Sequence, residues 1–197
     1  MAIVSRGFRS RRRRPDERVP PGQYVTADFP VLSAGPTPRI DAAHWSFEIV
    51  TEQRERVTWS WSELMAAGVE DITVDIHCVT RWSKLGTRWR GVSLDRLLTA
   101  VESSAQYAMV HSYGGYTTNV PLADLRGGKA WIAFEFDGRP LRPEHGGPAR
   151  LLIPHLYFWK SSKWVRGLEL MVADQPGFWE RNGYSLYGDP WTEDRYS

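Results

Sequence analysis

The stretch Ile72-Thr73-Val74-Asp75-Ile76-His77-Cys78-Val79 decides how the rest of the chain is interpreted. It is rich in β-branched residues, which favour a strand, and the polar residues 80–90 follow it. We expect a strand over residues 72–79 and an irregular loop over residues 80–90. Cys78, the one cysteine of the 197-residue sequence, would then lie at a strand end.

Short strands and short helices are predicted on both sides of this stretch. Ser60 and Glu63 match a capping box for a short helix that stops at Gly68, and Ser93 can cap a second helix running to Val101. Further strands, two of them paired as a hairpin before Ser60, are expected at residues 44–50, 55–59, 107–111, 117–120, 130–136, 151–153 and 164–171. Long, regularly alternating helices are missing, which favours an α+β fold with mixed β-sheets, short helices and long loops.

The chain divides into an arm and one domain. Residues 1–39 are rich in arginine and proline and predict an extended N-terminal arm, whereas residues 40–197 have the size of a single domain. Residues 1–18 hold seven arginines against two acidic residues, so the +2 charge of the whole chain leaves the remainder at −3. That charge argues against nucleic-acid binding by the domain. The aromatic residues 176–196 are expected to wrap back over it.

The cysteine content and the lengths of the apolar segments indicate in which cellular compartment the protein is expected. One cysteine cannot form an internal disulfide. The N-terminus lacks the apolar stretch of a signal peptide, and no segment approaches the roughly 18 apolar residues of a membrane span. We expect a cytoplasmic, soluble protein without a membrane span.

Two blocks of sequence contain the residues that could bind a metal or an anionic ligand. The first is His77-Cys78-Val79-Thr80-Arg81-Trp82-Ser83, followed by Trp89-Arg90-Gly91-Val92. A lone cysteine is more often a small buried apolar residue, but a thiolate also suits a soft metal, and His77 and Arg81 are expected to lower the pKa of the thiol.

The second block runs from His145-Gly146-Gly147-Pro148-Ala149-Arg150 into Tyr157-Phe158-Trp159-Lys160-Ser161-Ser162-Lys163. Arg150 offers a planar fork for oxygen atoms, Lys160 and Lys163 offer point charges, and the two serines offer donors. Gly146 and Gly147 permit a close backbone approach to a ligand. Taken alone, this block also fits an ordinary ion pair beside a turn.

Together the two blocks resemble the molybdopterin-binding domain of sulfite oxidase-type enzymes. The resemblance implies that the thiolate of Cys78 binds molybdenum and that the second block holds the pterin dithiolene and its phosphate. It implies cofactor contacts from Arg150, Lys160, Ser161, Ser162, Lys163, Ser112, Leu32, Ser33 and His145. The last of these stands where the catalytic subunits of periplasmic methionine sulfoxide reductase carry an asparagine. Arg81 and Tyr184 are the candidates for the substrate pocket.

The resemblance also implies a reaction and partners. The expected activity is oxygen-atom transfer, either oxidation of sulfite or reduction of S- or N-oxides, by a minimal catalytic domain that acts as a monomer. The sequence holds no Cys-x-x-Cys-His haem motif, so electrons would pass to or from a separate partner. Two alternatives stay open. One is a thiol hydrolase pairing Cys78 with His111, His145 or His155, and the other is a non-catalytic module that binds small ligands.

Overall fold

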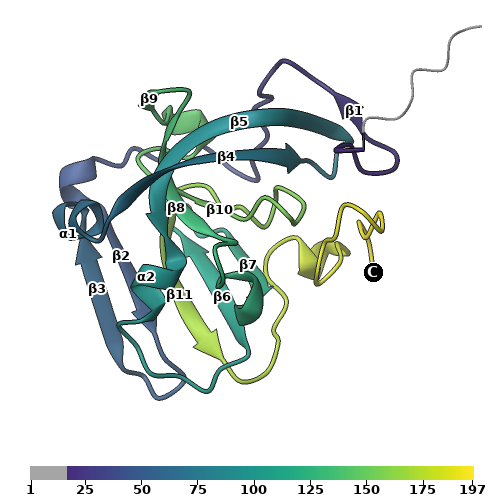
Figure 1. Ribbon diagram of the computed structural model, residues 1–197. Coiled ribbons are helices and arrows are strands. Elements are labelled where there is room, and N and C mark those ends of the chain that lie inside the picture. Colours follow the sequence, from purple (N-terminus) through teal and green to yellow (C-terminus); the bar gives the residue numbers. More distant parts are fainter. Residues whose placement is uncertain (1–16) are drawn as a thin grey trace, which may run out of the picture.

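Two β-sheets with a shared hydrophobic core form most of the fold in the computed structural model, which describes residues 17–197 (Figure 1). In one sheet the order is β1-β5-β8-β10, with β4 also paired to β5 and β9 to β8; in the other it is β3-β2-β11-β6-β7. The first sheet consists of β1 (Tyr24–Val25), β4 (Val69–His77), β5 (Trp82–Ser93), β8 (Trp131–Phe136), β9 (Arg139–Pro140) and β10 (Arg150–Leu152). The second consists of β2 (Ser46–Val50), β3 (Arg56–Ser60), β6 (Tyr107–Ser112), β7 (Thr117–Pro121) and β11 (Val165–Met171).

Helices are short and lie at the ends of strands. They are α1 (Trp61–Ala66) and α2 (Leu94–Leu98), with the 3₁₀ turns η1 (Ala42–His44), η2 (Leu122–Asp124), η3 (Pro143–His145) and η4 (Glu180–Asn182). This is the α+β architecture predicted from the sequence. None of the helices in residues 17–197 is long and apolar enough to cross a membrane.

Local signals identified both α-helices. The capping box of α1 is present, because Ser60 accepts a hydrogen bond from the Glu63 amide and the Glu63 carboxylate accepts one from the Ser60 amide. Ser93 caps α2 as expected. The predicted extension of α2 to Val101 is wrong, since the helix ends at Leu98, although Val101 still packs against the core.

The irregular loop expected over residues 80–90 is also wrong, because β5 begins at Trp82 and forms a hairpin with β4. Burial alternates along this strand: Thr87 and Trp89 are buried, whereas Arg88 and Arg90 are exposed. The polar residues that suggested a loop form the solvent-facing side of an antiparallel strand.

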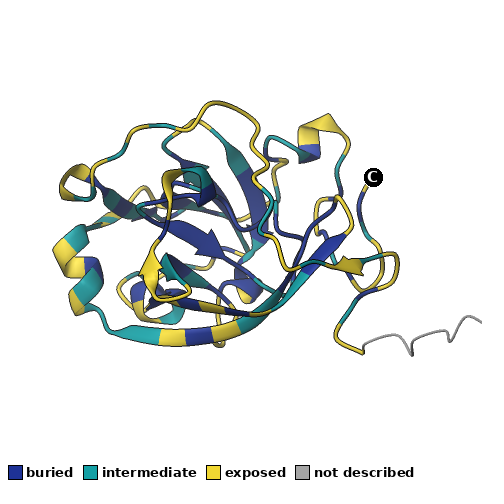
Figure 2. Ribbon diagram, turned by 90° about the horizontal axis from the view of Figure 1, so that it is seen from above, coloured by how far each residue is buried: buried dark blue, intermediate teal, exposed yellow. Residues whose placement is uncertain are grey.

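The core lies between the sheets, and Figure 2 shows the buried positions gathered in the strands that cross the middle of the molecule. Phe47 and Ile49 of β2 enter it from one sheet, and Ile132 of β8 enters it from the other. Gly91 lies where β5 crosses β8, and a Cβ there would lie 2.6 Å from the carbonyl oxygen of Ile132. This position therefore requires glycine.

Segments from both ends of the chain meet beside the β4–β5 hairpin (Figure 1). β1 pairs in parallel with the start of β5, with Tyr24 opposite Trp82. The C-terminal residues wrap back, as expected, and a bridge joins Tyr184 to Tyr196. A Cβ on Gly22 would lie 2.3 Å from the Glu193 carboxylate, so the two segments are in contact. The arginine run at residues 11–14 lies outside the described residues.

Candidate functional site

A cavity of about 420 Å³ opens between the β4–β5 hairpin, the N-terminal segment and the C-terminal segment. Its walls contain eight of the residues predicted for the site, drawn from five separate stretches of sequence. These are Leu32, Ser33, Cys78, Arg150, Ser161, Ser162, Lys163 and Tyr184. The fold therefore brings together the two sequence blocks, which are about seventy residues apart.

Cys78 begins the tight connection between β4 and β5. Its amide donates to the Trp82 carbonyl over 2.8 Å, and its carbonyl accepts from the Arg81 amide over 2.9 Å. Arg81 has φ of 76°, so the loop closes through a left-handed residue. The Cys78 side chain is only 6% exposed, but it reaches the cavity, where Sγ lies 3.2 Å from Thr80 Oγ1.

The electrostatics of this thiol differ from expectation. Burial raises the pKa of Cys78, and the Thr80 hydrogen bonds and the charge of Arg195 oppose that shift. The predicted lowering of this pKa by His77 and Arg81 is wrong. The imidazole of His77 is buried and bonds through Nδ1 to Ser83 Oγ at 2.9 Å, whereas Arg81 is exposed and does not line the cavity.

Arg150 places a fully buried positive charge in the cavity wall. It is 1% exposed, and its guanidinium donates to the carbonyls of Leu151 (3.4 Å), His145 (2.8 Å) and Ser161 (2.5 Å). Three of its five N–H groups are thereby used, and no carboxylate within residues 17–197 forms an ion pair with it. The guanidinium lies 4.0 Å from the centre of the Phe158 ring, and burial lowers the pKa of Arg150 to about 9. An anion in the cavity would supply the missing counter-charge.

Lys163 adds a second positive charge beside Arg150, on a partly buried side chain. Its ammonium donates to two carbonyls, those of Leu32 (2.7 Å) and Glu144 (2.6 Å). Burial, followed by repulsion from Arg150, lowers the pKa of Lys163 to about 8. The bond to Leu32 holds the N-terminal segment over this end of the cavity, where Ser33 also contributes to the wall. Leu32 and Ser33, both predicted as cofactor contacts, therefore lie in the cavity wall.

The three predicted serines have different positions. Ser162 lines the cavity and its hydroxyl bonds to that of Ser112, which lies behind the wall. Ser161 also lines the cavity, but its hydroxyl accepts from the Ile153 amide at 2.8 Å. Both serines in the cavity wall therefore already have hydrogen-bond partners, and Ser112 does not line the cavity.

His145 does not reach the cavity directly, because Phe29 stands between them. The two rings stack with centres 4.0 Å apart and planes 14° apart, and Phe29 itself lines the cavity. Nε2 of His145 lies 3.2 Å from Arg142, and buried Nδ1 has no partner among the described residues. A pterin contact from His145 would require Phe29 to move.

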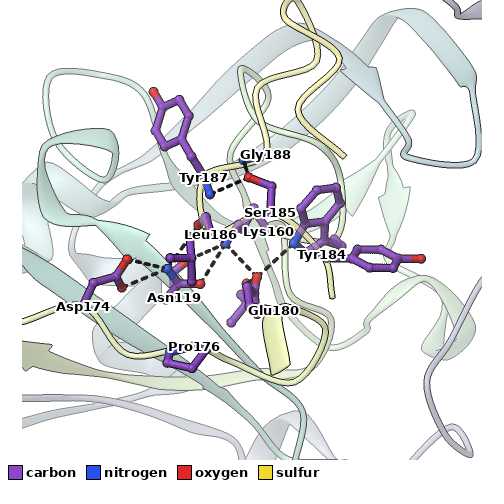
Figure 3. A network of polar contacts seen from close by, with 12 residues as sticks. Asn119, Lys160, Asp174, Pro176, Glu180, Tyr184, Ser185, Leu186, Tyr187 and Gly188 are labelled. Carbon is purple, nitrogen blue, oxygen red and sulfur yellow. Dashed lines mark hydrogen bonds and ion pairs between the residues drawn. The ribbon is translucent and has the colours of Figure 1, made fainter. Parts of the chain in front are cut away.

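Lys160 is not part of the cavity wall. Its ammonium is completely buried and donates to Glu180 Oε1 (2.7 Å), the carbonyl and side-chain oxygens of Asn119 (2.9 Å each) and the Leu186 carbonyl (2.7 Å) (Figure 3). Four acceptors saturate three N–H donors. The structure therefore corrects the expectation that Lys160 binds the cofactor, because this lysine anchors the C-terminal segment to β7.

An aromatic wall, formed by Trp159, Trp179 and Tyr184, closes the cavity near Cys78. The Tyr184 ring stacks on Trp179 with centres 4.9 Å apart and meets Trp159 edge-on at 5.1 Å. Tyr184 and Trp159 pack against the same hydrophobic cluster as Cys78. Tyr184 was predicted for the substrate pocket, whereas Trp159 and Trp179 were not assigned to it from the sequence.

Glycines touch the cavity at a different place from the one expected. Gly146 and Gly147 pack against their own chain, since a Cβ on Gly147 would lie 2.1 Å from the Leu141 carbonyl. Gly114 and Gly115, in the connection between β6 and β7, line the cavity instead.

The thiol hydrolase alternative lacks its histidine. The hydrogen bond of Cys78 Sγ within residues 17–197 is to Thr80. His111 instead faces Glu169 at 3.5 Å, and His155 faces Asp124 at 3.0 Å. Residues 17–197 contain no group of three or more His, Cys, Asp or Glu side chains that could together hold a metal ion.

Comparison with known families identifies the chain. The family model of the oxidoreductase molybdopterin-binding domain matches residues 34–179. The protein belongs to this family. It is an oxidoreductase of the sulfite oxidase type, and its cofactor is molybdenum with molybdopterin.

Relatives differ in how much of their length this chain covers. An uncharacterized oxidoreductase of Bacillus subtilis, YuiH, is 42% identical over 91% of this chain and 92% of its own length. A putative protein-methionine-sulfoxide reductase subunit of Azospira oryzae, YedZ1, is 25% identical over 85% of this chain and 66% of its own. The sulfane dehydrogenase SoxCD of Paracoccus pantotrophus shares the fold, with a TM-score of 0.63 and 17% identity over 75% of this chain and 42% of that one.

The cavity fits this cofactor at two ends. Arg150 and Lys163 provide the positive charges that a phosphate requires, and neither forms an ion pair with a carboxylate in the described chain. At the other end, Cys78 presents a sulfur atom of the soft kind that suits molybdenum. We refer to these below as the phosphate end and the sulfur end.

Proposed function

We propose that Cys78 ligates molybdenum and that the enzyme reduces neutral S-oxides, with the pterin held between the sulfur end and the phosphate end. The observation that supports this proposal is that a single cavity is lined by the thiol of Cys78 and by two cations, Arg150 and Lys163, that form no ion pair within residues 17–197. The bound group would supply two-electron redox chemistry and accept the oxygen atom, while the protein binds, orients and shields the reactants.

The distribution of charge favours a neutral substrate over sulfite. Among the described residues that line the cavity, Arg150 and Lys163 are the only cations, and both lie at the phosphate end. The sulfur end presents the aromatic wall and no cation. A doubly charged oxyanion there would lose its hydration without gaining a partner. A sulfoxide or N-oxide carries no net charge and has apolar groups that aromatic rings can contact.

Two of the relatives support this choice, because those from Azospira oryzae and Campylobacter jejuni are named as a putative subunit and a catalytic subunit of protein-methionine-sulfoxide reductase. Reduction of a sulfoxide gives a thioether and water, and it consumes two protons and two electrons. We expect the electrons to come from a separate protein. A monomer in the cytoplasm remains part of this proposal.

Tyr184 is suited to bind the substrate oxygen. Burial raises the pKa of this phenol, and the nearby Tyr196 and Cys78 raise it further. The phenol therefore stays protonated at neutral pH and can donate a hydrogen bond to an S=O oxygen. Its ring is held by Trp159 and Trp179, which fixes the direction of that donor.

Paired steady-state assays test the substrate class on cofactor-loaded enzyme. Methyl p-tolyl sulfoxide is supplied with a reduced viologen dye as electron donor, and sulfite is supplied with ferricyanide as acceptor. We expect sulfoxide-dependent dye oxidation that is absent in Cys78→Ala, and sulfite oxidation no faster than in that variant. Sulfite oxidation by the wild type without sulfoxide reduction would overturn the proposal.

A further inference from the structure

Arg195, near the C-terminus, lies against the backbone of the Cys78 loop. Its side chain is almost completely buried, and Nη1 donates to the carbonyl of Val79, the residue next to Cys78. The guanidinium is centred 4.9 Å from the middle of the Tyr157 ring. Arg195 does not line the cavity, so it approaches Cys78 from behind the loop.

The charge of Arg195 is only partly balanced. The nearest carboxylate oxygen is that of Glu193, 3.5 Å from Nη2, and Glu193 is about half exposed to water. Nη2 has no hydrogen-bond partner within residues 17–197. A buried cation paired to a hydrated carboxylate keeps a positive field in its surroundings, because solvent screens the carboxylate more than the cation.

Both ends of the chain hold the same loop. Gln23, in the N-terminal segment, donates through Nε2 to the Cys78 carbonyl at 3.1 Å, and Arg195 binds the next carbonyl along. The two segments touch each other where Gly22 meets Glu193. The carbonyls of Cys78 and Val79 are thus fixed by side chains from opposite ends of the sequence.

We propose that Arg195 is a positioning residue that fixes the Cys78 loop and directs a positive electrostatic field at the Cys78 sulfur. This rests on the proposed role of Cys78 as an anionic ligand, which such a field would stabilise. Arg195 thereby takes the electrostatic role that the sequence assigned to Arg81.

Selective alkylation tests this inference without cofactor, because Cys78 is the one cysteine in the chain. The full-length protein is made in a host that lacks the pterin pathway, and its folding is checked by thermal melting. Alkylation rates are measured with iodoacetate, an anion, and iodoacetamide, a neutral reagent of similar size. The thiolate attacks both reagents and displaces iodide, so their rate ratio cancels the ionised fraction and the accessibility of the sulfur and reports the local field.

The variants separate charge from structure. We expect Arg195→Gln to lower the iodoacetate to iodoacetamide ratio at least about threefold at low salt, and Arg195→Lys to restore it to within about twofold of wild type. Arg181→Gln, an exposed change in the same segment, should leave the ratio unchanged. Arg81→Gln should lower it less than Arg195→Gln does, because water screens the exposed charge.

An unchanged ratio in folded Arg195→Gln would overturn the inference, as would an equal or larger effect of Arg81→Gln. Neither result depends on molybdenum. Failure of the inference is therefore distinguishable from failure of the proposed function, which would appear as cofactor-loaded wild type without S-oxide reduction.

Discussion

The ammonium nitrogen of Lys160 lies 2.7 Å from Oε1 of Glu180, and neither side chain exposes any surface. The same oxygen accepts hydrogen bonds from Trp159 Nε1 at 3.0 Å and Thr118 Oγ1 at 2.8 Å. This ion pair thus joins β7, the cavity wall and the C-terminal segment. Figure 3 shows the pair with Asn119 and Leu186 beside it.

Removing one member of this pair should be costly. Lys160→Met leaves the Glu180 carboxylate buried without a counter-charge, so we expect the free energy of unfolding to fall by about 3–5 kcal/mol. Urea denaturation followed by tryptophan fluorescence measures it. The double variant Lys160→Met/Glu180→Gln should recover at least half of the loss. Arg88→Met, which removes an exposed ion pair with Asp137, should cost about 1 kcal/mol or less.

A double variant as unstable as Lys160→Met alone would show that the two charges are not coupled. Stability of Lys160→Met equal to that of Arg88→Met would show that the buried lysine is not required.

Arg150→Lys keeps the charge but removes the planar fork. We expect the pterin content of protein purified from a cofactor-producing host to fall at least about fivefold, because lysine cannot make bidentate contacts with a phosphate. Fluorescence of the oxidised pterin, measured per chain, checks this. Arg166→Gln, an exposed arginine on β11, serves as the control, and equal pterin in both variants would contradict the assignment of Arg150.

His145 should make stability depend on pH. Burial, and then repulsion from Arg142, Arg150 and Lys163, lowers the pKa of His145 to about 4, against a small opposing effect of Glu144. The unfolded chain binds this proton near pH 6.5 and the folded chain only near pH 4. Stability contributed by neutral His145 is therefore fully present above about pH 6.5 and declines as the pH falls to about 4.

Urea midpoints measured across that range check the sign. The wild type should lose more stability than His145→Gln between pH 6.5 and 4, since other titrating groups are common to both proteins. Parallel curves for the two proteins would refute the assignment.

Local patterns predicted most of the elements but not the long-range partners. The capping box at Ser60 and the β2–β3 hairpin depend on neighbours within a few residues, and the sequence shows them directly. Strand β5 was missed because Arg88 and Arg90 read as loop residues, although their exposure on one face is compatible with a strand. A charged residue can lie in a loop or on the exposed face of a strand. Which of the two applies is decided by whether the opposite face of the segment is covered by the core.

In the candidate site, too, local motifs were predicted from the sequence and long-range contacts were not. Cys78, Arg150 and Lys163 are placed together as their motifs predicted. Lys160 carries an equally good signal for anion binding, yet a carboxylate twenty residues later saturates it. Arg195 carries no signal at all, because its role depends on a contact with Val79 across 116 residues. Contacts of this range follow from topology and cannot be read from spacing.

Trp159 should set substrate preference. It is held by Glu180 through Nε1 and stacked on Tyr157 with ring centres 5.3 Å apart. Replacing it by alanine should raise the KM for methyl p-tolyl sulfoxide about two- to tenfold, the range expected for one lost aromatic contact, with a smaller change for dimethyl sulfoxide. Trp191→Ala, on an exposed side chain outside the cavity wall, should leave both KM values unchanged. Equal changes for the two sulfoxides would argue against an aromatic contact.

The molybdenum content of purified protein tests the central claim most directly. Wild type and Cys78→Ala are expressed together with a complete pterin pathway, and metal and chain concentrations are measured on the same samples. We predict close to one molybdenum per wild-type chain and at least about a tenfold lower ratio in the variant, with both proteins folded by thermal melting. Equal molybdenum in the two proteins, or none in wild type that carries the pterin, would contradict the assignment of Cys78 as the metal ligand.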